Sequence, residues 1–287
     1  MRHLIFLTCL LSAVPIKAQT SLTTQIYDID YGKDPSEETL VLLTSGHVAK
    51  LKKSDQLNFH KKRVKDNLPG EQWYQITLDK NRYITHIQET KSPFSSLDRK
   101  IQKINKALQS TYVPTTVESM AKAQQYHREG RRNYNGETQC FNRGMVWSYE
   151  WWKKHSVKSM KYWVFFTRNY IRRYNFEWWF HIAPYLHVMH EGKVVERAMD
   201  LKYTSGPVDL RRWTNIFMRN DAECKIVTKY SDYADYPYTG DCYVMRSNMY
   251  VYQPADLEMN EAWGYTKDSF LMDEVRGAYL EAFGIRL

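Results

Sequence analysis

The hydrophobic pattern is most regular between Trp178 and Asp200, a stretch that reads WWFHIAPYLHVMHEGKVVERAMD. Successive residues of a strand point to opposite faces, so this alternation predicts a half-buried β-strand. Glu191-Gly192 has the composition of a two-residue hairpin turn, and residues 194–199 resume the pattern as a return strand. With the turn centred there, the register places Asp200 diagonally beside His181 on one face. A shift of the turn by one residue would reverse that parity.

Four shorter runs of hydrophobic and β-branched residues come before this stretch, and each predicts a strand. They are residues 25–29, 39–43, 73–78 and 83–87. Residues 79–82, Asp-Lys-Asn-Arg, predict the turn between the last two runs. The basic stretch 50–65 predicts a solvated loop or face, with docking of an acidic partner as the alternative. We therefore expect residues 19–95 to form a small, β-rich N-terminal domain.

Helical patterns follow the break at Pro93. A capped helix is expected over residues 95–110, with one hydrophobic stripe facing a core. A second helix is expected over residues 116–126, and the polar stretch REGRRNYNGETQ after it indicates an exposed loop. Thr138 can then cap a helix that has Cys140 in its first turn.

Composition narrows the class of protein. The chain has 287 residues, with 43% hydrophobic and 25% charged positions, which is typical of a globular protein. Residues 1–18 have the pattern of a secretory signal peptide, so we expect a secreted or periplasmic protein. No later run is long and apolar enough for stable membrane insertion. Without Arg2 and Lys17 the net charge of +9 becomes 9 − 2 = +7, which favours anionic partners, yet no nucleic-acid-binding motif is present.

The cysteine count is odd once the signal peptide and its Cys9 are removed. Cys140, Cys224 and Cys242 remain, so one bridge leaves one thiol over in an oxidising compartment. Cys224 and Cys242 flank a turn-rich stretch, and a disulfide between them would staple that loop. Three single pairings exist and sequence alone leaves them open; in the pairing we favour, Cys140 is the free thiol.

Cys140, His181 and Asp200 occur in an order that suits nucleophilic catalysis. Unpaired backbone N–H groups at a helix start favour an anion, so they stabilise a thiolate there and an oxyanion formed beside it. A histidine held beside a carboxylate can act as the base for such a thiol. The structural alternative makes Cys140 a small buried hydrophobe and His181 a core histidine. His187, on the same strand face, is a rival base.

Three segments resemble the protein-glutaminase family of secreted protein-glutamine deamidases: CFNRG, WFHIAPYL and AMDLKYTSGPVDLRRW. In that family a Cys-aromatic-x-Arg segment starts a helix, a strand carries a histidine, and the third segment carries an aspartate. Cys140, His181 and Asp200 occupy these three catalytic positions, and the resemblance covers residues 113–257. It departs from the family after the aspartate, where Leu201-Lys202-Tyr203 stands in place of Pro-Ser-Leu, and in having fewer cysteines.

The resemblance implies an α+β fold with a transglutaminase/papain-like core, in which the nucleophile helix packs on an antiparallel sheet. Residues 96–287 would form the catalytic domain. Residues 19–95 would be an inhibitory pro-region that acts in cis until proteolysis removes it. Residues 166–176 have no match in the family, and their arginines, Arg168, Arg172 and Arg173, are expected to form a basic rim.

The activity that the resemblance implies is hydrolysis of side-chain amides of protein-bound glutamine, with release of ammonia through a thioester on Cys140. Substrates would be proteins or peptides with exposed glutamine; no cofactor or metal is expected, and we expect a monomer. A transglutaminase or a cysteine peptidase could use the same triad. A non-enzymatic exported binding protein is a further alternative, in which a surface formed by Trp147, Trp151, Trp152, Trp178 and Trp179 binds glycans or a partner.

Overall fold

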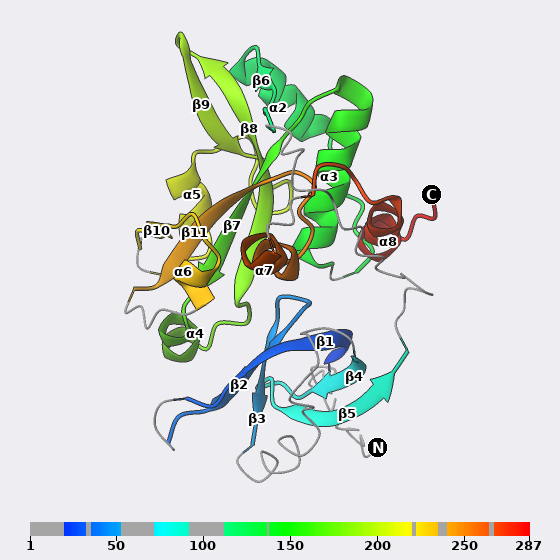
Figure 1. The fold of residues 1–287 in the computed structure, drawn as a ribbon, viewed down its shortest axis with the longest axis vertical. Coiled ribbons are helices and arrows are strands. Elements are labelled where there is room, and N and C mark those ends of the chain that lie inside the picture. Colours follow the sequence, from blue (N-terminus) through cyan, green and yellow to red (C-terminus); the bar gives the residue numbers. More distant parts are fainter. Residues whose placement is uncertain are drawn as a thin grey trace, which may run out of the picture.

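The computed structural model describes residues 20–32, 36–52, 72–91, 112–136, 138–219, 222–234, 240–263 and 267–287. The expected signal peptide, residues 1–18, and the helix expected over residues 95–110 lie outside the described residues. Two sheets form the protein, a five-stranded N-terminal one and a six-stranded one that carries most of the helices around it (Figure 1). The fold is α+β with a β-rich N-terminal region, as the sequence predicts.

The N-terminal sheet is antiparallel throughout, in the order β3-β2-β1-β4-β5. Its strands are β1 (Thr20–Asp30), β2 (Thr39–Leu43), β3 (Val48–Leu51), β4 (Trp73–Leu78) and β5 (Ile84–Thr90). β3 lies where the sequence indicated the start of a solvated basic stretch. Lys50 is instead buried there, and its Nζ lies 2.6 Å from a carboxylate oxygen of Glu38. The ion pair allows a lysine to occupy a buried strand.

The larger sheet has the order β10-β11-β7-β8-β6, and β9 pairs with β8. Its strands are β6 (Thr116–Val117), β7 (Met160–Phe166), β8 (Phe180–His190), β9 (Lys193–Ala198), β10 (Lys225–Ile226) and β11 (Cys242–Asn248). Most neighbours are antiparallel, while β6 runs parallel to β8 and β10 parallel to β11.

β8 is buried on both faces from Phe180 to Leu186, so the prediction of a half-buried strand is wrong for these residues. Pro184 faces helix α3, where a Cβ on Gly144 would lie only 3.7 Å from the proline Cδ. On the other face Tyr185 stacks on Tyr162 at 3.9 Å between ring centroids. Polar residues at alternate positions thus lie in a second buried layer, and are not exposed to water.

The hairpin turn lies where the pattern placed it. His190 pairs with Lys193, and Glu191 and Gly192 have φ of 49° and 73°, which suits a two-residue turn with both residues in the left-handed region. β9 ends at Ala198 opposite Tyr185. Beyond it the Met199 N–H still donates to the Pro184 carbonyl at 2.8 Å. Asp200 then approaches β8 from a chain that has left the ladder.

The helices before the hairpin begin later than expected. α2 runs over Met120–Glu129, four residues after the predicted start, because Thr116 and Val117 pair with β8 and Ser119 caps the helix. α3 runs over Cys140–His155 with Gln139 at its N-cap. Thr138 does not cap it, since its hydroxyl accepts a hydrogen bond from the Arg143 guanidinium at 2.9 Å. The other helices in the described residues are α4 (Arg168–Tyr174), α5 (Leu210–Asn215), α6 (Ser231–Ala234), α7 (Pro254–Trp263) and α8 (Met272–Phe283).

The N-terminal sheet packs against the start of β8 through the turn between β2 and β3. The Val48 N–H donates to the Glu177 carbonyl at 2.7 Å, and the Trp179 N–H donates to the Gly46 carbonyl at 3.0 Å. The ring of Tyr27 stacks on that of Trp179 at 4.6 Å. Backbone pairing and shared apolar burial therefore join the two parts directly beside the segment that leads to His181.

The arginines of α4 belong to this interface. Arg168 lies 3.3 Å from a carboxylate oxygen of Asp28, and Arg172 lies 2.7 Å from one of Asp30. Both acidic residues come from β1. Arg168 and Arg172 of the expected basic rim are thus paired with the N-terminal sheet. The sequence alone gave no sign that opposite charges 140 residues apart would meet.

Candidate active site

Cys140 is the first residue of α3, and among the described residues it is the free cysteine. Its side chain is buried, with 8% of the residue exposed. Cys224 and Cys242 form a disulfide, which confirms the predicted pairing. The helix start leaves the backbone N–H groups of its first turn without partners inside the helix, so they can hold negative charge beside the thiol.

His181 and Asp200 form a close buried pair. Nε2 of His181 lies 2.7 Å from Oδ2 of Asp200, and 2% and 0% of the two residues are exposed. A carboxylate only accepts, so Nε2 carries the proton and donates it to Asp200. The Trp213 indole N–H donates to the same Oδ2 at 3.0 Å. Because Asp200 occupies Nε2, the ring nitrogen left to bond the Cys140 thiol is Nδ1.

The electrostatics of this pair favour a charged imidazole. Burial alone lowers the pKa of His181, but the negative charge of Asp200 and the hydrogen bonds to Asp200 and Cys140 outweigh it, so the pKa lies above its ordinary value of 6.5. Burial likewise raises the pKa of Asp200, yet the charge of His181, the two hydrogen bonds and the nearby Arg143 bring it below the ordinary value. The carboxylate is therefore ionised and the imidazole binds a proton readily.

Aromatic side chains enclose the imidazole of His181. Phe217 lies 4.4 Å from it between ring centroids, Tyr203 lies 5.3 Å away, and Trp178 stacks on it at 5.7 Å. Burial raises the pKa of Tyr203 to about 12, so its hydroxyl stays protonated. Such a wall excludes water and strengthens the charge interactions inside it.

The sequence did not identify Phe217, Tyr203 or Arg143 as part of the site. Arg143 is buried on α3, one helical turn after Cys140, and its charge helps to keep Asp200 ionised. Its position in the CFNRG segment was a usable signal, because that spacing places a positive charge one helical turn from the nucleophile. Phe217 and Tyr203 carried no such signal.

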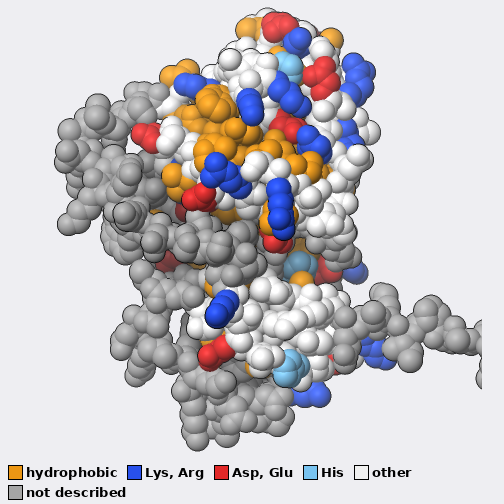
Figure 2. All heavy atoms as spheres, turned by 90° about the vertical axis from the view of Figure 1, so that its right-hand side faces the viewer, with side chains coloured by type: hydrophobic (Ala, Val, Ile, Leu, Met, Phe, Trp, Pro, Cys, Tyr) orange, Lys and Arg blue, Asp and Glu red, His pale blue; other side chains and the backbone are white. Residues whose placement is uncertain are grey.

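Two other proposals from the sequence do not lead to a second site. His187 pairs across the hairpin with Glu196, whose carboxylate lies 3.9 Å away, and it is not part of the Cys140 site. The tryptophans proposed as a glycan surface are mostly core residues, with Trp147, Trp151 and Trp179 buried. Trp152 is 39% exposed. Figure 2 shows one face of the protein, on which hydrophobic side chains lie among lysines and arginines.

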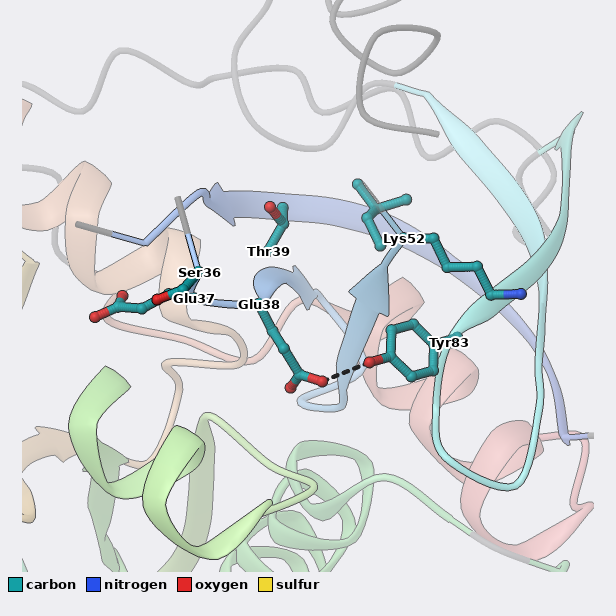
Figure 3. Close-up of a pocket in the computed structure, with 7 residues that line it drawn as sticks. Ser36, Glu37, Glu38, Thr39, Lys52 and Tyr83 are labelled. Atoms are coloured by element: carbon teal, nitrogen blue, oxygen red, sulfur yellow. Dashed lines mark hydrogen bonds between the residues drawn. The ribbon is translucent and has the colours of Figure 1, made fainter. Parts of the chain in front are cut away.

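A pocket of about 350 Å³ lies in the N-terminal sheet, away from Cys140 (Figure 3). Its polar lining is already paired, since the Tyr83 hydroxyl donates to Glu38 at 2.5 Å. Within the described ranges, no group of three or more His, Cys, Asp or Glu residues could hold a metal ion. No described helix has the length and apolar character needed to span a membrane.

Comparisons with known proteins give one matching sequence family and one similar fold. The sequence family described as Glutaminase matches residues 104–217, the part that contains all three candidate residues. The crystal structure of pro-protein-glutaminase is similar, with a TM-score of 0.52 at 13% identity over 91% of this chain and 92% of that one. The A47Q2 mutant of pro-protein-glutaminase gives a TM-score of 0.50 at 14% identity, over 82% and 85%. Curated protein sequences give no significant match.

Proposed function

We propose that this chain is a protein-glutaminase that deamidates glutamine side chains of proteins; the glutaminase match over residues 104–217 and the fold shared with pro-protein-glutaminase support this. The observation that carries the proposal is the His181 imidazole, which bonds Asp200 through Nε2 and faces the Cys140 thiol with its other side. A nucleophile, a base and an orienting carboxylate are the groups that acyl transfer requires.

In the proposed reaction the Cys140 thiolate attacks the carboxamide carbon of glutamine, and a C–S bond forms as the carbonyl oxygen becomes an oxyanion. N–H groups at the start of α3 stabilise that oxyanion. Protonated His181 gives its proton to the amide nitrogen, the C–N bond breaks, and ammonia leaves. His181 then takes a proton from water, whose oxygen attacks the thioester. The C–S bond breaks, which restores the thiolate and the imidazolium and releases glutamate.

Asp200 supports this cycle by holding the imidazole with Nδ1 toward Cys140 and by stabilising its charged form. The raised pKa of His181 and the lowered pKa of Asp200 are what such a role requires. A transglutaminase would pass the same thioester to a lysine amine, and a cysteine peptidase would cut the backbone. The glutaminase match favours water as acceptor and the side-chain amide as target.

The test is ammonia release from an unfolded, glutamine-rich protein such as casein, followed beside gel electrophoresis for cleavage or crosslinking. We expect ammonia without either change in chain length. Cys140→Ser should lower the rate by about 10⁴-fold or more, because the nucleophile acts as a unit with its base. His187→Gln, on the same strand outside the site, is the matched control and should stay active. Crosslinked product, whose formation also releases ammonia, or cleaved product without ammonia would exclude this function.

We further propose that residues 19–95 act as a pro-region of an exported protein. Support comes from the pro-protein-glutaminase fold and from the backbone pairing of Gly46 and Val48 with Trp179 and Glu177, two and four positions before His181. A form that starts near residue 95 should then deamidate faster than the full-length chain. Equal rates in the two forms would make the N-terminal sheet a permanent part of the enzyme.

A further inference from the structure

Asp200 is fixed by hydrogen bonds to its backbone carbonyl as well as to its carboxylate. While its carboxylate faces His181, its backbone carbonyl accepts hydrogen bonds from the Thr204 hydroxyl and the Thr204 N–H, each at 2.9 Å. The Tyr203 N–H adds a third donor at 3.2 Å. The turn that follows Asp200 therefore closes back on the residue itself, and the Thr204 hydroxyl is its side-chain tie.

His127 of α2 controls which way that hydroxyl points. Its Nε2 lies 3.0 Å from Oγ1 of Thr204, and its Nδ1 lies 3.0 Å from Nη2 of Arg132. A guanidinium can only donate, so Nδ1 accepts and Nε2 carries the proton. Nε2 then donates to Thr204, whose own proton is left for the Asp200 carbonyl. Arg132, His127 and Thr204 thus form a one-directional hydrogen-bond chain, here called the support chain.

Close packing fixes the same turn against α2. A Cβ on Gly130 would lie 2.0 Å from Cδ2 of Leu201, and a Cβ on Gly206 would lie 2.4 Å from Oε1 of Gln124. A Cβ at either position would force the side chain of Leu201 or Gln124 to move. Leu201 stands where the family pattern has proline, so the helix and its terminal glycine accommodate this chain's own loop.

The charges around the support chain keep it in one state. His127 is fully buried, and burial together with the positive charge of Arg132 lowers its pKa to about 4. The imidazole is therefore neutral at neutral pH, with its tautomer set by Arg132. A neutral ring of fixed tautomer can hold Thr204 in one orientation while His181 gains and loses protons.

We propose that His127, through Thr204, is a positioning residue that fixes the angle at which Asp200 meets His181. The inference rests on the proposed function of that pair. It makes α2 part of the active-site scaffold, although α2 contributes no group that touches the substrate.

The test compares Thr204→Val, which removes the hydroxyl at equal shape, with Thr204→Ser, which keeps it. We expect Thr204→Val to lower kcat by about 10²-fold with little change in KM, because a misplaced orienting group costs rate and not binding. It should also lower the pKa of His181 in an NMR titration. Thr204→Ser should restore both values. A Thr204→Val protein with wild-type kcat and wild-type His181 titration would overturn the proposal.

Two measurements keep the result interpretable. His127→Phe fills the same buried site without either hydrogen bond, and it should give the same lowered His181 pKa should Thr204→Val fail to fold. The alkylation rate of Cys140 by iodoacetamide at neutral pH reads the state of the Cys140–His181 pair without any substrate. Thr204→Val should be alkylated more slowly than the wild-type protein, whether or not the wild-type protein releases ammonia. Absence of ammonia therefore counts against the proposed function, and equal alkylation rates count against the support chain.

Discussion

Asp200 lies between two buried histidines whose electrostatic environments are opposite. His181, on the carboxylate side, is 2% exposed and has a pKa above 6.5. His127, on the side of the backbone carbonyl, is 0% exposed and has a pKa lowered to about 4. Burial lowers the pKa of each. The neighbours decide the outcome: an aspartate bonded to Nε2 of His181, and an arginine bonded to Nδ1 of His127.

This contrast separates two functions that one residue type can serve. A histidine whose charged form is stabilised can carry protons through a reaction, whereas one that stays neutral is a fixed donor and acceptor. The same aspartate touches both, through its carboxylate for one and through its backbone carbonyl, by way of Thr204, for the other. Position in a strand or helix alone would not distinguish them.

Asp200→Asn is the change that should alter the contrast most. Without the carboxylate charge, burial dominates at His181 and its pKa should fall toward that of His127. We expect kcat to drop by roughly 10³- to 10⁴-fold, as for loss of an orienting aspartate in a triad. Glu196→Gln, beside His187, is the matched control for loss of one carboxylate near a histidine. A drop of less than tenfold in Asp200→Asn would leave the aspartate without its proposed part in the reaction.

His127→Gln should change how stability depends on pH. In the native protein the pKa of His127 is about 4 against an ordinary 6.5, so between these values the unfolded chain binds a proton that the folded one excludes. The free energy of unfolding therefore falls as pH drops from 6.5 to 4, by about 3 kcal/mol from this residue. Urea denaturation at the two ends should show a smaller loss in His127→Gln. An equal loss in both proteins would contradict the lowered pKa.

The positions of Cys140, His181 and Asp200 could largely be predicted from the sequence alone. The turn at Glu191-Gly192 sets the register of the hairpin, and the register puts Asp200 beside His181, because alternation and turn chemistry are local. Cys140 at a helix start followed from the polar, glycine-containing stretch before it. The cap was wrong, since Thr138 bonds Arg143 instead.

The support chain behind the Asp200 carbonyl, formed by Arg132, His127 and Thr204, could not be predicted in the same way. His127 and Thr204 are 77 residues apart, and neither belongs to a motif that names the other. The burial of β8 on both faces was also missed, because alternation reports polarity and not what covers it. Arg172 meeting Asp30 depends on how two sheets dock. These contacts are products of packing, so their signal in one sequence is slight.

Arg132→Gln should give the smallest effect and the sharpest view of cause. Arg132 is exposed, so its charge is screened, and burial is the larger cause of the low pKa of His127. Removing it should raise that pKa modestly, worth on the order of 0.5 kcal/mol. Added salt should raise the His127 pKa in the wild-type protein and leave it nearly constant in Arg132→Gln, because salt screens the exposed charge and not the effect of burial. An NMR titration of His127 at low and high salt separates the two causes. Equal salt dependence in both proteins would assign the neutral state of His127 to burial alone.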